Sequence, residues 1–147
     1  MKPFKEAVSL VITNNQNQFL AVKRPNDPKD ELAGLWGFPA VTLKEGESHQ
    51  DAATRVGHQK LGVEIELGDK IGDNTHDRGT YILHLTDYQA NVTRGIPKAP
   101  QSDTSVTQYS ECMYSDDPTI LIPNARKGSQ CTQLFLESRG IDWRSGK

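Results

Sequence analysis

The chain contains 147 residues with a formal net charge of −2; 24% of the residues are charged and 35% are hydrophobic. This length fits a single domain spanning residues 1–147, and the charge provides no general basic surface, so we expect no nucleic acid partner. The sequence has no apolar run long enough to cross a membrane and no signal-peptide core, which predicts a cytoplasmic protein without a membrane partner. Cys112 and Cys131 lack CxxC spacing, and we expect them to be reduced thiols.

The beginning of the chain predicts a β-hairpin. Residues 6–13 (EAVSLVIT) carry apolar side chains at alternating positions and on both faces, which indicates a strand covered on both sides. Residues 14–17 (NNQN) form a polar turn, and residues 18–24 (QFLAVKR) predict the returning strand. A polar loop over residues 25–31 follows.

A helix is predicted in the middle of the chain. Ser48 and Asp51 form an S-x-x-D pattern, a variant of the capping box, so the helix should begin near His49. Gly62 suits the left-handed position after a helix end. The alternating residues 63–67 (VEIEL) then predict a half-buried strand.

The next stretch predicts strands separated by polar connections. Residues 68–78 are rich in Asp, Asn and Gly and predict a turn-rich connection. Residues 80–87 predict a strand that can continue through Val92. Residues 94–105 predict a long exposed loop, and residues 106–114 a weakly patterned strand.

The end of the chain predicts one more helix. Residues 119–122 form a short apolar run that Pro123 ends, and residues 129–139 have helical spacing up to Gly140. Strands that bracket one helix, with a second helix at the end, predict an α/β fold with a mixed β-sheet between helices.

Residues 34–63 resemble the signature of the Nudix hydrolase family (MutT-like proteins), G-x5-E-x7-R-E-U-x-E-E-x-G-U, where U is apolar. Anchored on Arg55, the match places Glu47 at the first acid, Gly62 at the late glycine and Val63 at the last apolar position. The resemblance implies an α/β/α sandwich that uses Mg²⁺ or Mn²⁺ to hydrolyse nucleoside diphosphates linked to another moiety.

The same match departs from the signature at most of its carboxylates. Valine offers no metal ligand, glutamine only a neutral carbonyl, and lysine a cation that repels the metal. We therefore expect the usual ligand set to be absent, with Glu47 as the one retained box acid, and ordinary Mg²⁺-dependent activity to be weak or lost. The departing positions are Val41, Val56, Gly57, Gln59 and Lys60.

Glu47 and Arg55 are the candidate catalytic residues. The resemblance implies that the pair forms a salt bridge that shapes the loop and the helix, and a direct metal or catalytic role is the alternative. Lys60 lies on the helix face that carries the metal ligands in the family, so its ammonium could contact a phosphate instead. A solvated helix face is the plainer interpretation.

Four further residues are candidates for substrate binding. Trp36 and Phe38 could stack on a base, because bases present π-faces to aromatic side chains. Lys23 and Arg24 end a strand near the place where the family contacts substrate. Core aromatics and exposed basic residues are the plainer alternatives for these four.

Two functions are compatible with these residues. The first is a Nudix-type pyrophosphohydrolase with a reduced or relocated metal site. The second is a non-catalytic Nudix-fold module that binds a nucleotide-like anion or a protein partner and needs no cofactor. The missing carboxylates favour the second function on chemical grounds, since they remove both metal ligands and their electrostatic work. A homodimer is expected only by analogy with the family.

Overall fold

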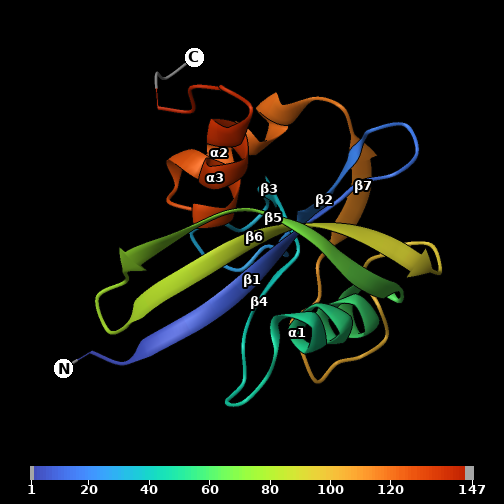
Figure 1. The fold of residues 1–147 in the computed structure, drawn as a ribbon, viewed down its shortest axis with the longest axis horizontal. Coiled ribbons are helices and arrows are strands. Elements are labelled where there is room, and N and C mark those ends of the chain that lie inside the picture. Colours follow the sequence, from blue (N-terminus) through green and yellow to red (C-terminus); the bar gives the residue numbers. More distant parts are fainter. Residues whose placement is uncertain (1, 145–147) are drawn as a thin grey trace.

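The computed structural model describes residues 2–144, whose strands form two sheets (Figure 1). The first has the order β4-β1-β6-β5, with β1 parallel to β6 and antiparallel to β4. The second has the order β3-β2-β7 and is antiparallel. The strands are β1 (Phe4–Ile12), β2 (Phe19–Lys23), β3 (Trp36–Gly37), β4 (Ala40–Thr42), β5 (Glu64–Asp77), β6 (Ile82–Arg94) and β7 (Glu111–Ser115).

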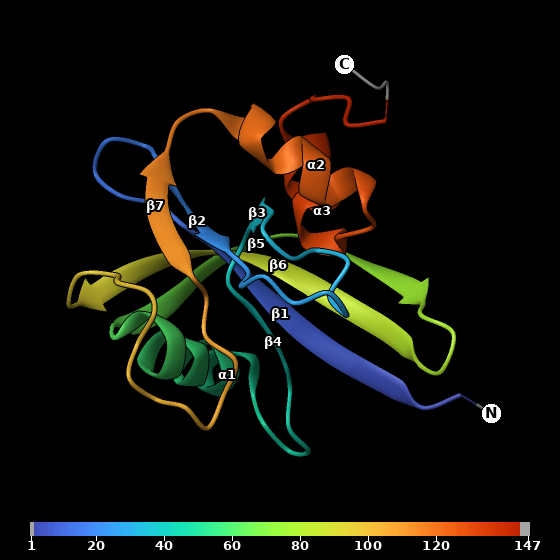
Figure 2. The same ribbon diagram turned by 180° about the vertical axis from the view of Figure 1, so that it is seen from behind.

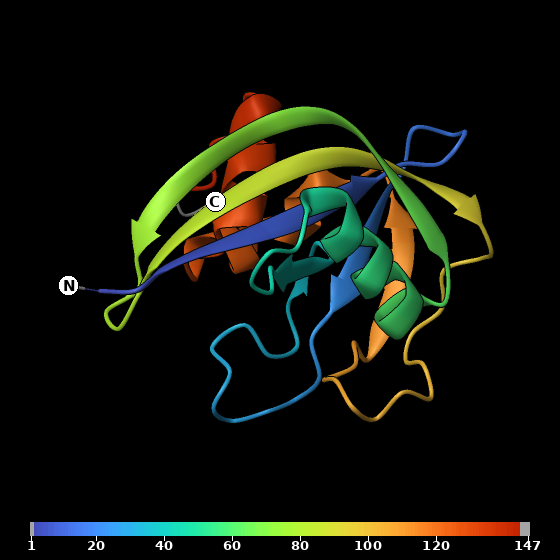
Figure 3. The ribbon, with the colours of Figure 1, turned by 60° about the horizontal axis from the view of Figure 1, so that its bottom comes forward.

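Helices cover the strands from two sides. Figure 3 shows α1 in front of the strands and α3 behind them. This arrangement confirms the predicted α/β/α sandwich with a mixed β-sheet between helices. None of the helices within residues 2–144 is long and apolar enough to span a membrane. The helical segments are α1 (His49–Val56), a π-helical turn (Gly57–Leu61), a 3₁₀ turn (Pro118–Leu121), α2 (Ile122–Arg126) and α3 (Gln130–Ser138).

The central strand β1 separates two hydrophobic cores. Val11 belongs to the core under α2 and α3, whereas Leu10 and Ile12 belong to the core under α1. Leu10 and Ile12 are fully buried and Val11 is nearly so, which confirms the prediction that this strand is covered on both faces. Burial of alternate side chains on opposite faces is what places a strand between two helical layers.

The predicted hairpin between the first two strands is wrong. The strands and the polar turn exist, and Asn14 accepts hydrogen bonds from the backbone N–H groups of Gln16 and Gln18. Only the isolated bridge between Thr13 and Phe19 pairs them, however, and β2 continues in the other sheet. Both edges of β1 are already occupied by β4 and β6, so β2 finds its partners elsewhere.

The predicted turn-rich connection over residues 68–78 is also wrong. These residues continue strand β5, which pairs with β6 as far as Asp77 opposite Ile82. The pairing is interrupted by register shifts between Leu67 and Lys70 and between Lys70 and Gly72, where the strand bulges. A solvent-facing edge strand tolerates Asp, Asn and Gly that a buried strand would exclude, so the composition misleads here.

The helix of the motif begins as the sequence predicts. Ser48 is the N-cap, and its hydroxyl accepts a hydrogen bond from the backbone N–H of Asp51. Gly62 ends the helical segment in the left-handed conformation, with φ of 70°. The last turn is π-helical, which the capping signals do not reveal.

The later segments are only partly as predicted. The long loop is confirmed, but it extends to Ser110, so β7 covers only the second half of the predicted strand over residues 106–114. The predicted end at Pro123 is wrong, because Pro123 occupies the first turn of α2, where a missing N–H costs nothing. The last helix is confirmed as α3, with Gly140 at φ of 70° beyond its end.

Candidate functional site

A bidentate ion pair joins Glu47, in the loop before the motif helix, to Arg55 in the last turn of α1. Nε of Arg55 donates to Oε2 of Glu47 at 2.9 Å, and Nη2 donates to Oε1 at 2.8 Å. The backbone N–H of Lys44 donates to Oε1 as well, at 2.9 Å. Hydrogen bonds to Arg55 and Lys44 hold the pKa of Glu47 at about 2, and the same pairing raises the pKa of Arg55. Glu47 therefore carries a charge whose oxygens already have donors.

The three positions at which this chain lacks a carboxylate of the signature differ in their surroundings. The Val56 side chain is 1% exposed and packs in the core under α1. Gln59 is half-buried, and its backbone carbonyl accepts a hydrogen bond from Nε2 of Gln108 at 2.8 Å. The ammonium of Lys60 lies 4.8 Å from the ring centroid of Tyr109. A core valine, an amide and a cation do not fit the oxygen-rich ligand set that Mg²⁺ requires.

The Lys60 ammonium lies in a partly desolvated and positive environment. Burial lowers its pKa, and the charges of Arg24 and Arg55 lower it further. Within residues 2–144, no carboxylate is within ion-pair distance of the Lys60 ammonium, and no group of three or more His, Cys, Asp or Glu side chains is arranged to hold a metal.

A cavity of about 310 Å³ lies beside Lys60, between the three-stranded sheet and the helical layer of α2 and α3. Two loops flank it: the loop before β3 contributes Pro25 and Asp27, and the loop before β7 contributes Thr107. Figure 2 shows α2 and α3 on the side of the molecule opposite α1. The volume of the cavity falls at the lower end of the range for small-molecule sites.

Asn124 is a buried polar residue in the wall of this cavity that sequence reasoning missed. It is 3% exposed, and Oδ1 accepts a hydrogen bond from Oγ1 of Thr132 at 2.8 Å. A Cβ on Gly37 would lie 3.2 Å from the Asn124 amide, so the absence of a side chain at Gly37 lets β3 lie close to α2. The signal in the sequence is an asparagine between apolar residues just after Pro123.

The predicted substrate-binding residues divide into two groups. Arg24, Phe38 and Lys60 line the cavity. Phe38 is 5% exposed and packs edge-on against two core rings, so only part of it faces the cavity. Lys23 and Trp36 pair with each other instead, the ammonium lying 4.9 Å from the indole centroid, and neither lines the cavity.

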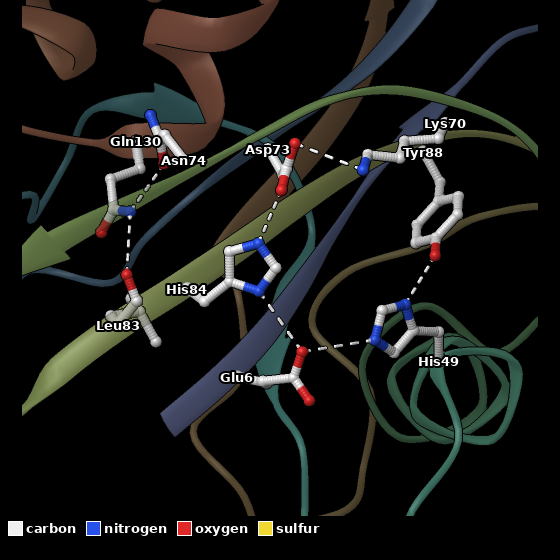
Figure 4. Close-up of polar contacts among 9 residues, drawn as sticks. All are labelled: Glu6, His49, Lys70, Asp73, Asn74, Leu83, His84, Tyr88 and Gln130. Carbon is white, nitrogen blue, oxygen red and sulfur yellow. Dashed lines mark hydrogen bonds and ion pairs between the residues drawn. The ribbon is translucent and has the colours of Figure 1, made fainter. Parts of the chain in front are cut away.

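A separate polar network lies on the sheet beside α1 (Figure 4). Nδ1 of His49 and the hydroxyl of Tyr88 are 2.5 Å apart, which ties the first turn of α1 to β6. Glu6 and Asp73 flank His84, with contacts of 3.3 and 2.7 Å, and the Asp73 hydrogen bond is the largest cause that raises the pKa of His84. None of these residues lines the cavity. Their contacts join α1, β1, β5 and β6, so the network stabilises the packing of α1 on the sheet.

Comparisons with known proteins identify the family. The NUDIX domain model matches residues 3–117, and the chain therefore belongs to the NUDIX domain family. This result confirms the resemblance carried by the motif around Arg55. Members of the family act on nucleoside diphosphate derivatives.

Two relatives carry names that refer to nucleotide hydrolysis. The chain is 32% identical over 83 residues to the putative 8-oxo-dGTP diphosphatase 2 of Mycobacterium tuberculosis, which covers 54% of this chain and 56% of that protein. It is 28% identical over 80 residues to the CTP pyrophosphohydrolase of Escherichia coli, which covers 54% and 57%. The chain thus spans about half the length of these relatives.

Solved structures show the same fold. The solution structure of the E. coli ORF135 protein has a TM-score of 0.71 at 21% identity and covers 99% of this chain and 96% of that chain. The crystal structure of the MutT protein from Methanosarcina mazei Go1 has a TM-score of 0.67 at 16% identity and covers 95% of each chain. At these identities the likeness concerns the fold.

Proposed function

We propose that this protein is a Nudix-fold module that binds a nucleoside diphosphate or a related nucleotide-like anion, with Lys60 and Arg24 replacing divalent cations. In this proposal ordinary Mg²⁺-dependent hydrolysis is weak or absent. The observation that carries it is the half-buried ammonium of Lys60, which borders the cavity and contacts a neutral ring rather than a carboxylate.

The electrostatics of this ammonium favour an anionic ligand. Burial and two neighbouring cations make the charged form of Lys60 costly in the free protein, which is why its pKa is lowered. An anion that enters the cavity lowers that cost by adding opposite charge at short range. Arg24 lines the same cavity, although its guanidinium is partly satisfied by Asp30 at 3.2 Å. A diphosphate would therefore meet two cations here.

The remainder of the cavity suits the ring of a nucleotide. Leu35, Phe38 and Val22 supply apolar wall, and the buried Asn124 amide supplies oriented hydrogen-bonding groups. An apolar pocket with a few convergent polar groups is the usual form of a small-molecule site. The relatives named for 8-oxo-dGTP and CTP support a nucleotide as the ligand class.

Binding without metal tests the proposal directly. UDP, ADP, CTP and 8-oxo-dGTP would be titrated calorimetrically in excess EDTA. We expect at least one to bind, and Lys60→Gln to weaken that binding about tenfold, because a hydrogen bond to a charged group is lost. Lys5→Gln is the matched control, since Lys5 also stacks on a tyrosine ring, at 4.5 Å, but does not line the cavity. No binding by any of the four nucleotides would refute the proposal.

Hydrolysis is the second candidate function, favoured by family membership and by the retained Glu47. It would be tested by following nucleotide turnover while Mg²⁺ or Mn²⁺ is titrated. Specific metal-dependent turnover that Glu47→Gln abolishes would overturn the non-catalytic proposal. The variant Gln59→Glu/Lys60→Glu tests the alignment, because both side chains are only half-buried. Increased metal affinity in an unchanged fold would support it, and unchanged affinity would count against it.

A further inference from the structure

A wider cavity of about 540 Å³ adjoins the first one. The two cavities meet at the proposed phosphate site, because their walls share seven residues: Arg24, Asp30, Leu32, Ala40, Lys60, Ser129 and Cys131. The wider cavity then continues toward the turn between β5 and β6 and the loop between α2 and α3, where Arg78 and Lys127 line it.

The Arg78 guanidinium is held in place by neutral acceptors. Nε and Nη2 donate to Oε1 of Gln130 at 3.0 and 2.6 Å, and Nη2 also donates to the carbonyl of Gly128 at 3.0 Å. Within residues 2–144, no carboxylate lies within ion-pair distance of this guanidinium. Arg78 is therefore oriented, but its charge is not compensated.

Gln130 is built to hold that orientation. Its side chain is 2% exposed, and Nε2 donates to Oδ1 of Asn74 at 2.7 Å and to the carbonyl of Leu83 at 3.4 Å (Figure 4). With its amide nitrogen fixed on β5 and β6, the amide oxygen must point to Arg78. These contacts use Nε and Nη2 of Arg78, so within the described residues the N–H groups of Nη1 remain available as donors to an anion.

Lys127 adds a second uncompensated cation on the other side of the wider cavity. It is exposed on the loop before α3, and within the described residues its ammonium has no ion pair. The two acidic residues of the lining are Asp30, which pairs with Arg24, and Glu31. The end of the cavity at Arg78 and Lys127 is thus electropositive.

The size of this cavity argues for more than a terminal phosphate. Small-molecule sites occupy about 300–1,000 Å³ and enclose most of a drug-sized ligand. A cavity of about 540 Å³ beside the proposed phosphate site has room for a sugar-sized group, and the hydroxyl of Tyr81 in its lining is a polar group that such a ligand could contact.

We infer that the wider cavity binds the second moiety of a nucleoside diphosphate-linked ligand, and that this moiety carries an anionic group of its own, held by Arg78 and Lys127. The inference rests on the proposed function, which supplies the nucleotide and diphosphate part of the ligand. It narrows the ligand class to compounds such as a nucleoside diphosphate linked to an acidic sugar.

UDP-glucose and UDP-glucuronate form a matched pair of probes, because they differ by a hydroxymethyl group and a carboxylate on the sugar. ADP-ribose and ADP-ribose 1″-phosphate form the corresponding adenine pair, which differs by one phosphate on the second ribose. Both pairs would be titrated calorimetrically in EDTA. We expect the more anionic member of at least one pair to bind about tenfold more tightly, the effect of one charge-assisted contact.

Variants locate this preference. Lys127→Gln should reduce it without disturbing the fold, since the Lys127 side chain has no polar partner in the described residues. Arg78→Gln should abolish it. Lys98→Gln and Arg94→Gln are the matched controls, because both residues are exposed cations that line neither cavity. Equal binding of both members of each pair would overturn the inference.

The two proposals fail in different ways. If UDP or ADP binds and Lys60→Gln weakens the binding, but neither pair is discriminated, the inference alone is wrong. If UDP, ADP and all four probes fail to bind, the inference is wrong together with nucleotide binding at this site. Discrimination that survives both Arg78→Gln and Lys127→Gln would place the anionic group elsewhere and would also refute the inference.

Discussion

The carboxylate of Glu47 and the guanidinium of Arg55 face each other in a bidentate contact, with N–O distances of 2.8 and 2.9 Å. Nη2 of Arg55 also donates to the carbonyl of Thr42 at 3.0 Å. One guanidinium thus ties α1 to the loop before it and to the end of β4. The structure therefore contains the salt bridge between Glu47 and Arg55 that the family resemblance implies.

Arg55→Lys should lower the free energy of unfolding by about 1–2 kcal/mol, because an ammonium keeps the charge but cannot form the planar fork. Urea denaturation would measure the change. Lys44→Arg, in the same loop, is the control, because only the backbone of Lys44 contacts Glu47. An Arg55→Lys variant as stable as the natural protein would contradict this account of the pair.

The same ion pair predicts a loss of stability in acid. The folded-state pKa of Glu47 is about 2, below its ordinary value of 4.5, so the unfolded chain takes up the proton first as the pH falls. The contribution of Glu47 to stability is therefore complete above pH 4.5 and is lost between about pH 4.5 and 2. The difference in stability between the natural protein and Glu47→Gln should shrink over that window. A difference that stays constant from pH 6 to pH 3 would be the contrary result.

Local patterns in the sequence predicted the elements that local physics determines. The Ser48 cap, the left-handed Gly62 and the burial of both faces of β1 each depend on residues close in the chain. The pairing of strands, in contrast, depends on residues that are far apart in the chain. β1 pairs with β6 through residues such as Ser9 and Asp87, which are 78 apart, and nothing in the first strand encodes that partner.

The candidate site shows the same division. The pattern around Arg55 predicted where Glu47 and Lys60 lie in the motif. It could not predict that Lys60 stacks on Tyr109, or that Gln130 holds Arg78 across 52 residues of sequence. Such contacts depend on how the two sheets and the helical layers pack together, which residue spacing within a segment does not report.

Gly57→Ala should destabilise the protein, although alanine is the better helix former. Gly57 has ordinary helical torsion angles, so an exposed site would gain stability from the change. Here a Cβ would lie 2.8 Å from Cδ1 of Ile65 and 2.9 Å from the carbonyl of Val63. The backbone carbonyl cannot move away cheaply, and we expect a cost of about 1–3 kcal/mol. Chemical denaturation would measure it, with Thr54→Ala on the same helix as the control. A gain in stability would show that the backbone of Gly57 does not lie this close to Val63 and Ile65.

A buried carboxyl group on β6 predicts an opposite pH effect. Asp87 is fully buried, and its Oδ1 accepts a hydrogen bond from the hydroxyl of Ser9, whereas Oδ2 has no hydrogen-bond partner among the described residues. Burial raises the pKa of Asp87 to about 8, and only the Ser9 hydrogen bond opposes this shift. The nearby thiol of Cys131 is neutral at physiological pH, since burial raises its pKa to about 11.

Asp87→Asn should therefore stabilise the protein increasingly as the pH rises. Between the ordinary Asp pKa of 3.8 and about 8, the unfolded chain loses the Asp87 proton while the folded protein keeps it, so each rise in pH favours unfolding of the natural protein. Asparagine cannot ionise, and its amide adds only a pH-independent offset. The stability difference should grow by up to about 1.4 kcal/mol per pH unit over this window and then level off. Urea denaturation at pH 4.5, 6, 7 and 8 would measure it, and parallel stability curves for the two proteins would show that Asp87 is ionised in the folded state.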